Sequence, residues 1–384
     1  MKGMDEIMTS AAYIHIPFCH HICHYCDFNK VFMKNQPVDR YIEMLIREME
    51  TVHTHSEPMK SIFVGGGTPT ALDAKQLAKL CEGISRVFKI SESTEYTFEA
   101  NPGDLSKDKI SVLKAHGVNR LSFGVQSFND RLLEKIGRNH RTEDVYRSIR
   151  EAREEGFSNI SIDLIYALPE QTLEDFEDTV DRALDLDLPH YSGYSLIVEP
   201  KTVFYNLMRK GRLPLPGEDT EAAMYDLLMG KMASKGIHQY EISNFSKQGY
   251  ESLHNLTYWN NEAYYGFGAG AHGYLNGVRY SNIGPVSKYI QAVEEGKRPV
   301  FHEAEVTRFE SMEEEMFLGL RKTEGVALPA FKEKYHEELD HVFRDPLKDM
   351  TARGLLEVHQ DRVRLTNEGR FLGNEVFQSF LGLN

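Results

Sequence analysis

Short runs of β-branched and aromatic residues alternate with longer segments of helical periodicity from residue 12 to about residue 200. This alternation is typical of βα units, which build a parallel sheet or barrel. The runs predict six strands, at Ala12–Ile16, Ser61–Val64, Tyr96–Glu99, Arg120–Val125, Asn159–Ile165 and His190–Leu196. Apolar residues at intervals of three and four predict helices between the strands. Examples are Val38–His53, Asp73–Phe88, Ser106–His116, Thr142–Glu155 and Thr172–Leu186.

Polar residues gather where these strands end. A cysteine-rich loop follows the first strand and a Gly-Gly-Gly-Thr-Pro turn follows the second. Glu99, Gln126 and Ser195 lie at the ends of later strands. Parallel βα sheets and barrels place their active sites at the carboxyl ends of the strands, so we expect one site here. Asp163 lies inside an apolar strand, and in a closed barrel its carboxylate needs a polar partner such as a ribose hydroxyl or an arginine.

Cys19, Cys23 and Cys26 have the spacing CxxxCxxC and are three of the four cysteines in the chain. Three thiolates this close can hold a [4Fe-4S] cluster and leave its fourth iron open to a small molecule. The alternative is a structural zinc site that His20, His21 or His24 completes, although zinc ligands usually come as two separated pairs. Cys81 lies in an apolar helical stretch, which predicts a buried core thiol.

Two glycine-rich stretches allow different interpretations. Gly65–Gly67 is either a tight strand-to-helix turn or a loop that brings bare backbone close to a charged ligand group. It matches neither the Walker loop nor the GxGxxG fingerprint, which are the glycine-rich loops that bind nucleotides. Tyr265–His272 lacks the context of a dinucleotide site and is predicted to pack its backbone closely beside the cavity. His272 is predicted to be a hydrogen-bonded core histidine.

The 384 residues are enough for one large and one smaller domain. We expect a polar lead at 1–10, a barrel at 11–245, a connecting segment at 246–300 and an accessory domain at 301–384. The last part predicts helices at Glu310–Leu320, Pro329–Tyr335 and Val342–Arg353, then strands at Leu356–His359 and Arg362–Leu365. Helices followed by a hairpin predict a winged-helix-like α+β domain that covers the open side of the barrel or contacts a partner. Thr366 is expected to cap a last helix running through Leu372 to Phe380.

Charge and composition exclude several classes of protein. The net charge of −14 disfavours binding to nucleic acid. No segment approaches the ~20 apolar residues that cross a bilayer, so an integral membrane protein is not expected. Few cysteines in a long chain indicate a reducing compartment, and the lead lacks the features of a targeting signal, so we expect a cytoplasmic protein.

Several motifs together resemble one known superfamily. They are Tyr13–Cys19, the CxxxCxxC spacing, the Gly-Gly-Gly-Thr-Pro turn and Gly124–Gln126, and they resemble the radical S-adenosylmethionine (SAM) enzymes. The chain is most similar to the group that contains oxygen-independent coproporphyrinogen III oxidase and a related heme chaperone. The resemblance implies a partial (β/α)6 barrel and a [4Fe-4S] cluster whose open iron binds SAM. It also implies an electron donor, and reductive cleavage of SAM to a 5′-deoxyadenosyl radical.

The same resemblance assigns SAM-binding positions. Tyr13 would lie beside SAM near the cluster, the methionyl end would meet the glycine turn, and Glu99 would hold its polar groups. Tyr25 would pack against the adenine, although a core aromatic is nearly as good an interpretation. The full set of expected SAM residues is Tyr13, Tyr25, Gly66, Gly67, Thr68, Glu99, Gln126, Arg138, Asp163 and Ser195. No residue is singled out as catalytic.

Two features separate the chaperone from the oxidase. The oxidase has a further cysteine where this chain has Phe28, and it has a longer N-terminal lead. The segment His254–Trp259 matches the HNxxYW motif of the chaperone and contains the only tryptophan. An imidazole can ligate heme iron, and Tyr258 and Trp259 offer flat apolar surface to a macrocycle. In the alternative, the aromatics seal the barrel mouth and His254 is only a hydrogen-bond donor.

The sequence therefore predicts a SAM- and cluster-binding protein that carries heme as cargo to acceptor hemoproteins. Whether it also acts as an enzyme stays open. One alternative is the oxidase, which decarboxylates coproporphyrinogen in porphyrin biosynthesis. Another is a structural metal-binding or interaction protein without catalysis. Weak homodimerisation is compatible with the family, and no feature of the sequence requires it.

Overall fold

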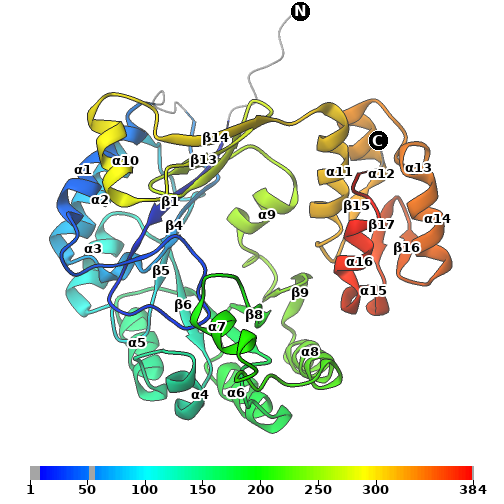
Figure 1. The fold of residues 1–384 in the computed structure, drawn as a ribbon, viewed down its shortest axis with the longest axis horizontal. Coiled ribbons are helices and arrows are strands. Elements are labelled where there is room, and N and C mark those ends of the chain that lie inside the picture. The colour runs from blue at the N-terminus through cyan, green and yellow to red at the C-terminus, as the bar shows by residue number, and fades with distance from the viewer. Residues whose placement is uncertain (1–8, 52–56, 383–384) are drawn as a thin grey trace, which may run out of the picture.

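The computed structural model describes residues 9–51 and 57–382. Its main feature is a curved sheet in which nine of the described strands follow the order β11-β1-β4-β5-β6-β7-β8-β10-β9 (Figure 1). Six neighbouring strands in this order run parallel and form the wall of a partial barrel. They are β1 (Ala11–Ile16), β4 (Ser61–Gly66), β5 (Glu95–Ala100), β6 (Arg120–Gln126), β7 (Asn159–Tyr166) and β8 (His190–Ser195).

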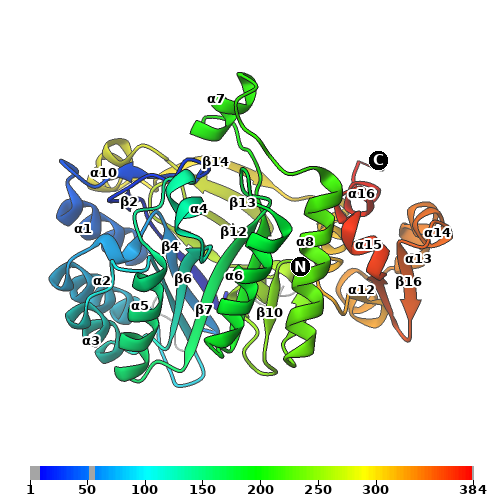
Figure 2. The same ribbon diagram turned by 90° about the horizontal axis from the view of Figure 1, so that it is seen from below.

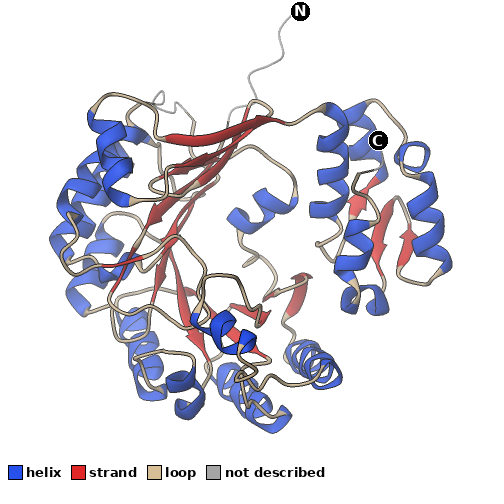
Figure 3. Cartoon of the chain, in the orientation of Figure 1, coloured by secondary structure: helices blue, strands red, loops and turns tan. Residues whose placement is uncertain are grey.

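Helices cover the outer face of this sheet (Figure 3). Each buries one apolar face, as in α2, where Leu77, Leu80 and Ile84 are buried and an Asp73–Gln76 capping box fixes the first turn. Figure 2 shows α6 and α8 packed side by side. The helices are α1 (Val38–Met49), the 3₁₀ turn η1 (Pro69–Ala71), α2 (Ala74–Val87), α3 (Lys107–Ala115), α4 (Asp130–Lys135), α5 (Thr142–Glu154), α6 (Leu173–Asp185), α7 (Val203–Arg209) and α8 (Glu218–Ser234).

All six strands predicted from the sequence are confirmed, as are the five helices predicted between them. The bounds differ by a few residues. The helix predicted at Val38–His53 ends at Met49, and His53 lies outside the described residues. The buried side chains of strands and helices share one continuous apolar core, which includes Cys81. The prediction of a core thiol is confirmed, and burial raises the pKa of Cys81 to about 12.

The sheet extends beyond the parallel strands at both edges. At one edge, β10 (Asn244–Ser246) and β9 (His238–Glu241) add antiparallel strands next to β8. At the other edge, β11 (Tyr265–Phe267) runs parallel to β1. The segment predicted to connect the two domains thus contributes a strand to the barrel sheet. It also contributes α9 (Leu253–Trp259), β12 (His272–Leu275), β13 (Val278–Asn282) and α10 (Val286–Glu294), while β14 (Val300–Glu305) completes a small antiparallel sheet with β12 and β13.

The glycine-rich stretch at β11 packs closely against β1, as predicted, although none of its residues lines the cavity at the strand ends. Gly268 has a φ of +98°, and an added Cβ would lie 2.6 Å from the carbonyl oxygen of His15. Only a residue without a side chain fits this approach. The prediction that His272 is a core histidine is wrong, because its position at the start of β12 leaves the side chain exposed.

The C-terminal domain has a hydrophobic core of its own and the predicted winged-helix-like α+β form. A three-stranded sheet of order β15-β17-β16 packs on helices. The predicted final helix is instead two short helices that meet at Leu372, and Thr366 caps the first of them through the N–H of Gly369. The elements are α11 (Arg308–Gly319), β15 (Val326–Ala327), α12 (Leu328–Tyr335), α13 (Leu339–Val342), α14 (Arg344–Ala352), β16 (Leu356–His359), β17 (Arg362–Leu365), α15 (Asn367–Phe371) and α16 (Gly373–Gln378).

This domain lies beside the open side of the curved sheet, with α9 between the two (Figure 1). No helix in the described ranges is long and apolar enough to cross a membrane.

Candidate functional site

A cavity of about 990 Å³ lies at the carboxyl ends of the parallel strands. One wall consists of strand ends and the cysteine loop, and the opposite wall consists of α9, the turn after β9 and residues 370–377 of the C-terminal domain. A volume near 1,000 Å³ is large for a small-molecule site and accommodates more than one ligand of SAM size. The C-terminal domain thus closes the open side of the barrel, which is one of the two roles predicted for it.

The three motif cysteines line this cavity together. Cys19 lies in the short strand β2 (Phe18–Cys19), which pairs with β3 (Val31–Phe32). The hydroxyl of Thr68 donates to Cys19 Sγ at 3.6 Å, and Arg138 Nη1 donates to Cys23 Sγ at 3.6 Å. Donors of this kind stabilise thiolate ligands and tune the metal that they hold.

Burial, unlike these hydrogen bonds, disfavours the thiolate form of the cysteines. It raises the pKa of Cys19 to about 11, against the Thr68 hydrogen bond, and raises the pKa of Cys26, against the charge of Lys30. A bound cation removes this penalty, because thiolates are the form that ligates metal. Among the described residues, no three His, Cys, Asp or Glu side chains converge on a site for a single metal ion. The soft donor set and its hydrogen bonds fit a [4Fe-4S] cluster.

His24 anchors the cysteine loop to the barrel. Its backbone N–H donates to the carbonyl of Ile136 at 3.0 Å, and its Nδ1 lies 3.0 Å from the carbonyl oxygen of Lys135. Its own carbonyl accepts the N–H of Phe204 at 3.0 Å. The side chain is therefore occupied by backbone contacts. His20 and His21, the other fourth ligands considered for zinc, are exposed.

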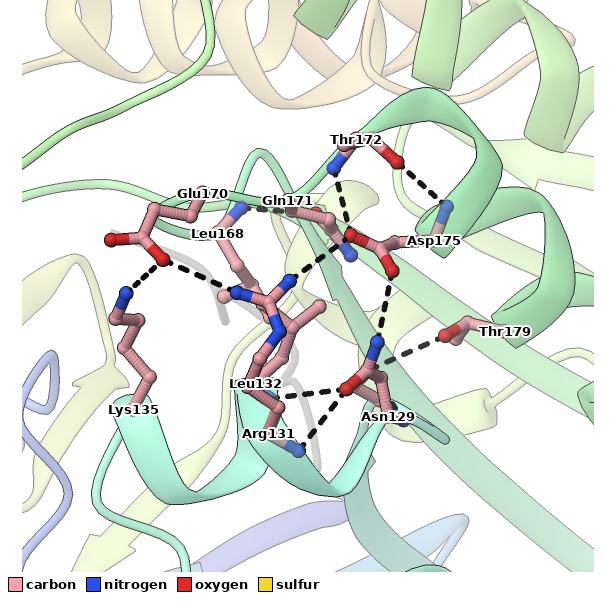
Figure 4. A network of polar contacts seen from close by, with 11 residues as sticks. Asn129, Arg131, Leu132, Lys135, Leu168, Glu170, Gln171, Thr172, Asp175 and Thr179 are labelled. Atoms are coloured by element: carbon pink, nitrogen blue, oxygen red, sulfur yellow. Dashed lines mark hydrogen bonds and ion pairs between the residues drawn. The ribbon is translucent and has the colours of Figure 1, made fainter.

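A polar network holds α4, the helix that His24 contacts, against the start of α6 (Figure 4). Asn129 caps α4 by accepting the N–H of Arg131 at 3.1 Å, and its amide donates to Asp175 at 2.9 Å. Arg131 bridges Asp175 and Glu170, and Lys135 also pairs with Glu170. The network fixes the helix that leads into Arg138.

The glycine turn is a tight strand-to-helix turn, and its approach to a charged ligand group stays a prediction. Gly66 has a φ of +112°, and an added Cβ would collide with the imidazole of His15. A Cβ added at Gly67 would lie 2.8 Å from the carbonyl carbon of Pro17. The turn therefore needs glycine in order to pack on the strand before the cysteines, and its backbone also lines the cavity.

Glu99 faces the cavity from the end of β5 and accepts the N–H of Gly66 at 2.9 Å. Burial raises its pKa to about 7, with a further contribution from Asp163, while Gly66 and Arg120 oppose the change. Burial also raises the pKa of Asp163, against hydrogen bonds from Ser192 and Ser122 and the charges of two arginines. Two carboxyl groups held partly neutral in this way favour a ligand that brings positive charge or hydrogen-bond donors.

Arg138 joins the cysteine loop to the strand ends. Besides Cys23, its guanidinium donates to Asn101 Oδ1 at 2.9 Å and to the carbonyl of Gly124. Asn101 in turn donates to Thr68 Oγ1 at 3.1 Å. The sequence analysis missed Asn101, although its position directly after β5 is the signal that identified the other strand-end residues.

All of the expected SAM residues except Tyr13 line the cavity. The Tyr13 hydroxyl bonds to His15 Nδ1 at 2.9 Å, and its ring packs near Phe63. Tyr25 lines the cavity and also packs against a small apolar cluster under α4, as a core aromatic does, and its contact with adenine stays a prediction. Ser195 lines the cavity and donates to Glu221.

The HNxxYW motif forms α9, which Ser252 caps. His254 is 1% exposed, and its Nδ1 and Nε2 lie 2.9 Å from Ser61 Oγ and 2.8 Å from the Tyr258 hydroxyl. Burial lowers its pKa to about 3. His254 is not part of the cavity lining, so its arrangement is that of the hydrogen-bonded alternative; a heme-ligand role for it stays a prediction that requires α9 to move.

The two aromatic residues of the motif differ in the cavities that they line. Trp259 lines the large cavity, whereas Tyr258 lines a smaller cavity of about 340 Å³ on the other side of α9. Trp259 lines this second cavity as well, together with Tyr264 and Arg279. The motif therefore separates two cavities, with its tryptophan at the boundary.

Several buried polar atoms around the large cavity have no protein partner. Because buried polar groups are almost always hydrogen-bonded, such atoms mark places where a ligand or water completes the site. These atoms are Gln126 Oε1, Arg138 Nε, Glu241 Oε2, Asn244 Oδ1, Trp259 Nε1 and Arg321 Nε. Glu241, Asn244 and Arg321 were not predicted from the sequence, since they lie at the ends of the short strands β9 and β10 and in the turn after α11, far along the chain from the motifs.

The comparisons with known proteins agree with this geometry. Residues 13–183 match the radical SAM superfamily, and residues 306–372 match the HemN C-terminal domain. Coproporphyrinogen III oxidase (HemN) from Escherichia coli has the same fold, with a TM-score of 0.86 and 23% identity over 98% of this chain and 91% of that one. Fold and site define a radical SAM protein, a class whose cofactors are a [4Fe-4S] cluster and SAM.

Two relatives place the chain more closely. It is 58% identical to the heme chaperone HemW of Bacillus subtilis (strain 168) over 97% of this chain and 99% of that protein. It is 31% identical to the heme chaperone HemW of Escherichia coli (strain K12) over 98% of this chain and 100% of that protein. This protein belongs to the HemW family.

Proposed function

We propose that this protein binds heme and delivers it to acceptor hemoproteins. The observation that carries the proposal is similarity along the whole chain, with 58% identity to a relative named heme chaperone HemW over 97% of the residues. The chain also has the HNxxYW motif, and its tryptophan lies in the wall of the cysteine-lined cavity. Phe28, where the oxidase has a cysteine, argues against decarboxylation of coproporphyrinogen.

Cys19, Cys23 and Cys26 are the proposed ligands of the cluster. Thr68 and Arg138 support the sulfurs of Cys19 and Cys23 through hydrogen bonds of 3.6 Å. When bound, the cluster supplies an electron and SAM supplies a sulfonium that can accept it. The protein supplies the loop that holds the three sulfurs on one side of the cavity.

The expected SAM residues that line the cavity are proposed to hold SAM next to these cysteines. Glu99 is suited to the ammonium group, because its carboxyl is buried and has few competing cations. Gln126 has an unpaired Oε1 that can accept a hydrogen bond from the ligand. Tyr13 contributes indirectly, by holding His15 behind the glycine turn.

For heme, we propose that Trp259 is the principal contact of the motif. Its ring is part of the cavity wall and its Nε1 has no protein partner. Tyr258 and His254 support α9 from behind through their mutual 2.8 Å hydrogen bond. Ligation of heme iron by His254 would require this bond to break.

The experiment begins with anaerobically reconstituted protein loaded with hemin and passed through a gel-filtration column. Wild type is expected to retain hemin and to transfer it to added apomyoglobin, measured by the Soret spectrum of holomyoglobin. Trp259→Ala is expected to retain less hemin, whereas Val358→Ala, a change at a 59% exposed residue of the C-terminal hairpin, is expected to match wild type. Loss of hemin from wild type on the column would overturn the proposal. So would efficient conversion of coproporphyrinogen III to protoporphyrinogen with SAM and dithionite.

A further inference from the structure

Two arginines of the C-terminal part face the cavity without an acidic partner. Arg321 and Arg370 both line it, and in the part of the chain that the structure describes neither has a carboxylate within ion-pair distance. Four of the other five arginines of the same domain are paired with a carboxylate. These pairs are Arg308–Glu337, Arg353–Glu375, Arg362–Glu324 and Arg364–Glu357. In a chain with a net charge of −14, two unpaired guanidinium groups in one cavity wall need a separate explanation.

Arg321 is held in a fixed position that leaves donors available. Its guanidinium lies over the Trp259 ring, 4.5 Å from the ring centroid, and 5.8 Å from the centroid of Phe377. Its Nε is buried and unpaired. Burial raises the pKa of Glu241, and Arg321 opposes this from beyond ion-pair distance. Stacking therefore orients the planar group, while its N–H donors stay free for a ligand.

Arg370 is half-buried in α15 and donates Nη1 to the neutral oxygen of Gln239 at 3.0 Å. This contact fixes the side chain without neutralising its charge. The surface next to it is apolar, since Phe371 is 41% and Leu372 is 43% exposed and both line the cavity. The wall thus combines two cationic groups with exposed apolar and aromatic surface.

The barrel wall carries acids of its own. Glu99 and Asp163 line it at the strand ends, while Arg138 and Lys30 lie next to the cysteines. The strand-end acids disfavour an anionic ligand group next to them, whereas Arg321 and Arg370 attract one. A flat apolar ligand with carboxylates at one edge matches both walls, with its face on Trp259 and Phe371 and its carboxylates away from the acids.

We infer that Arg321 and Arg370 bind the two propionate groups of heme and set its orientation in the cavity. The inference rests on the proposed function, and it names the residues that recognise the cargo. The iron of a macrocycle held in this way is turned toward the interior of the cavity, and the propionate edge lies at the C-terminal domain. Movement of this domain away from the barrel would then release heme by removing both contacts together.

The experiment measures hemin affinity by quenching of the fluorescence of Trp259, the only tryptophan in the chain. It uses full-length protein with its cluster reconstituted anaerobically. The variants are Arg321→Gln, Arg370→Gln, the double variant, and Arg364→Gln as a matched control whose guanidinium pairs with Glu357 at 2.7 Å outside the cavity. Hemin dimethyl ester, which lacks both carboxylates, is titrated into wild type in parallel. Iron and sulfide content and the thermal midpoint check that each variant is folded.

Each single substitution is expected to weaken hemin binding about tenfold and the double substitution about a hundredfold, as for charge-assisted hydrogen bonds. The ester should bind wild type about as weakly as hemin binds the double variant, and the control should bind like wild type. Equal affinity of wild type for hemin and its ester would overturn the arginine assignment, even if Arg321→Gln fails to fold. Hemin affinity in the double variant equal to that of wild type would overturn it as well. A wild type that binds neither compound would overturn the proposed function itself.

Discussion

Replacement of Glu99 by glutamine is expected to change how the stability of the ligand-free protein depends on pH. The folded protein raises the pKa of this carboxyl to about 7 from its usual 4.5, mainly by burial. Below pH 4.5 the carboxyl group is neutral in both the folded and the unfolded chain, so it does not lower the free energy of unfolding. As the pH rises through 7, the folded state loses stability relative to a residue that cannot ionise. A difference of about 2.5 pH units at ~1.4 kcal/mol each limits this loss to about 3.5 kcal/mol.

The measurement is the thermal midpoint of wild type and Glu99→Gln between pH 5 and pH 8.5. An unfolding entropy of about 2.1 cal/mol/K per residue converts the full loss into about 4 °C for a chain of this length. The Glu99→Gln variant should therefore unfold at nearly the wild-type temperature at pH 5 and up to about 4 °C higher at pH 8.5. Glu48, whose pKa burial also raises to about 7, is unchanged in both proteins and cancels in the comparison.

The same substitution tests the proposed role of Glu99 toward SAM. If the carboxylate binds the ammonium group, wild type must lose a proton in order to bind SAM below about pH 7, and its affinity should fall about tenfold for each further pH unit. Glu99→Gln should bind SAM more weakly and without this pH dependence. Exposed Glu134, with 76% of its side chain accessible, provides the control Glu134→Gln. A difference between the thermal midpoints of wild type and Glu99→Gln that stays constant between pH 5 and 8.5 would refute the raised pKa of Glu99.

The remaining predictions concern the cluster and the buried histidines. Arg138→Gln removes the donor to Cys23 and should lower cluster affinity about 10- to 100-fold, measured as bound iron and sulfide, whereas Arg147→Gln at the surface should have no effect. Cys23→Ala should abolish the cluster, and Cys81→Ala should keep it at a cost of about 1–2 kcal/mol for the lost packing; equal loss in both would contradict the ligand assignment. Burial lowers the pKa of His15 and His140 to about 4 and of His254 to about 3. Stability from these neutral rings is complete above pH 6.5 and lost as the pH falls toward 4 for His15 and His140 and toward 3 for His254, by up to about 3.5 kcal/mol for each of the first two and about 5 kcal/mol for the third. Circular dichroism should therefore detect acid unfolding in that range and not at pH 7.

Predictions from local sequence patterns agree best with the structure where side chains belong to regular strands and helices. Glu99, Gln126 and Ser195 were placed in one site because each follows or ends a parallel strand, and parallel strands end at the same edge. Asp163 was added because a carboxylate inside an apolar strand needs a polar partner. The motif cysteines followed from their spacing. Tyr13 was expected in the site because of the resemblance to the radical SAM enzymes, but it does not line the cavity and its hydroxyl is bound to His15.

Contacts between distant segments could not be predicted in this way. His254 was predicted to be a candidate heme ligand because imidazole ligates iron. Only folding brings Ser61, at the start of β4, next to His254 Nδ1. Likewise, the strand that begins at Tyr265 joins β1 more than 200 residues earlier in the chain, and no local pattern encodes that pairing.

The sequence by itself determined the βα order, the cysteine motif and the acids at the strand ends, because each depends on spacing within one short segment. Tertiary structure alone decided that residues 370–377 contribute to the second wall of the cavity, and that Arg321 stacks on Trp259 and lines the same cavity as Glu99 and Asp163. The physical reason is that side-chain burial and the balance of opposite charges across a cavity arise only when separate elements pack against one another.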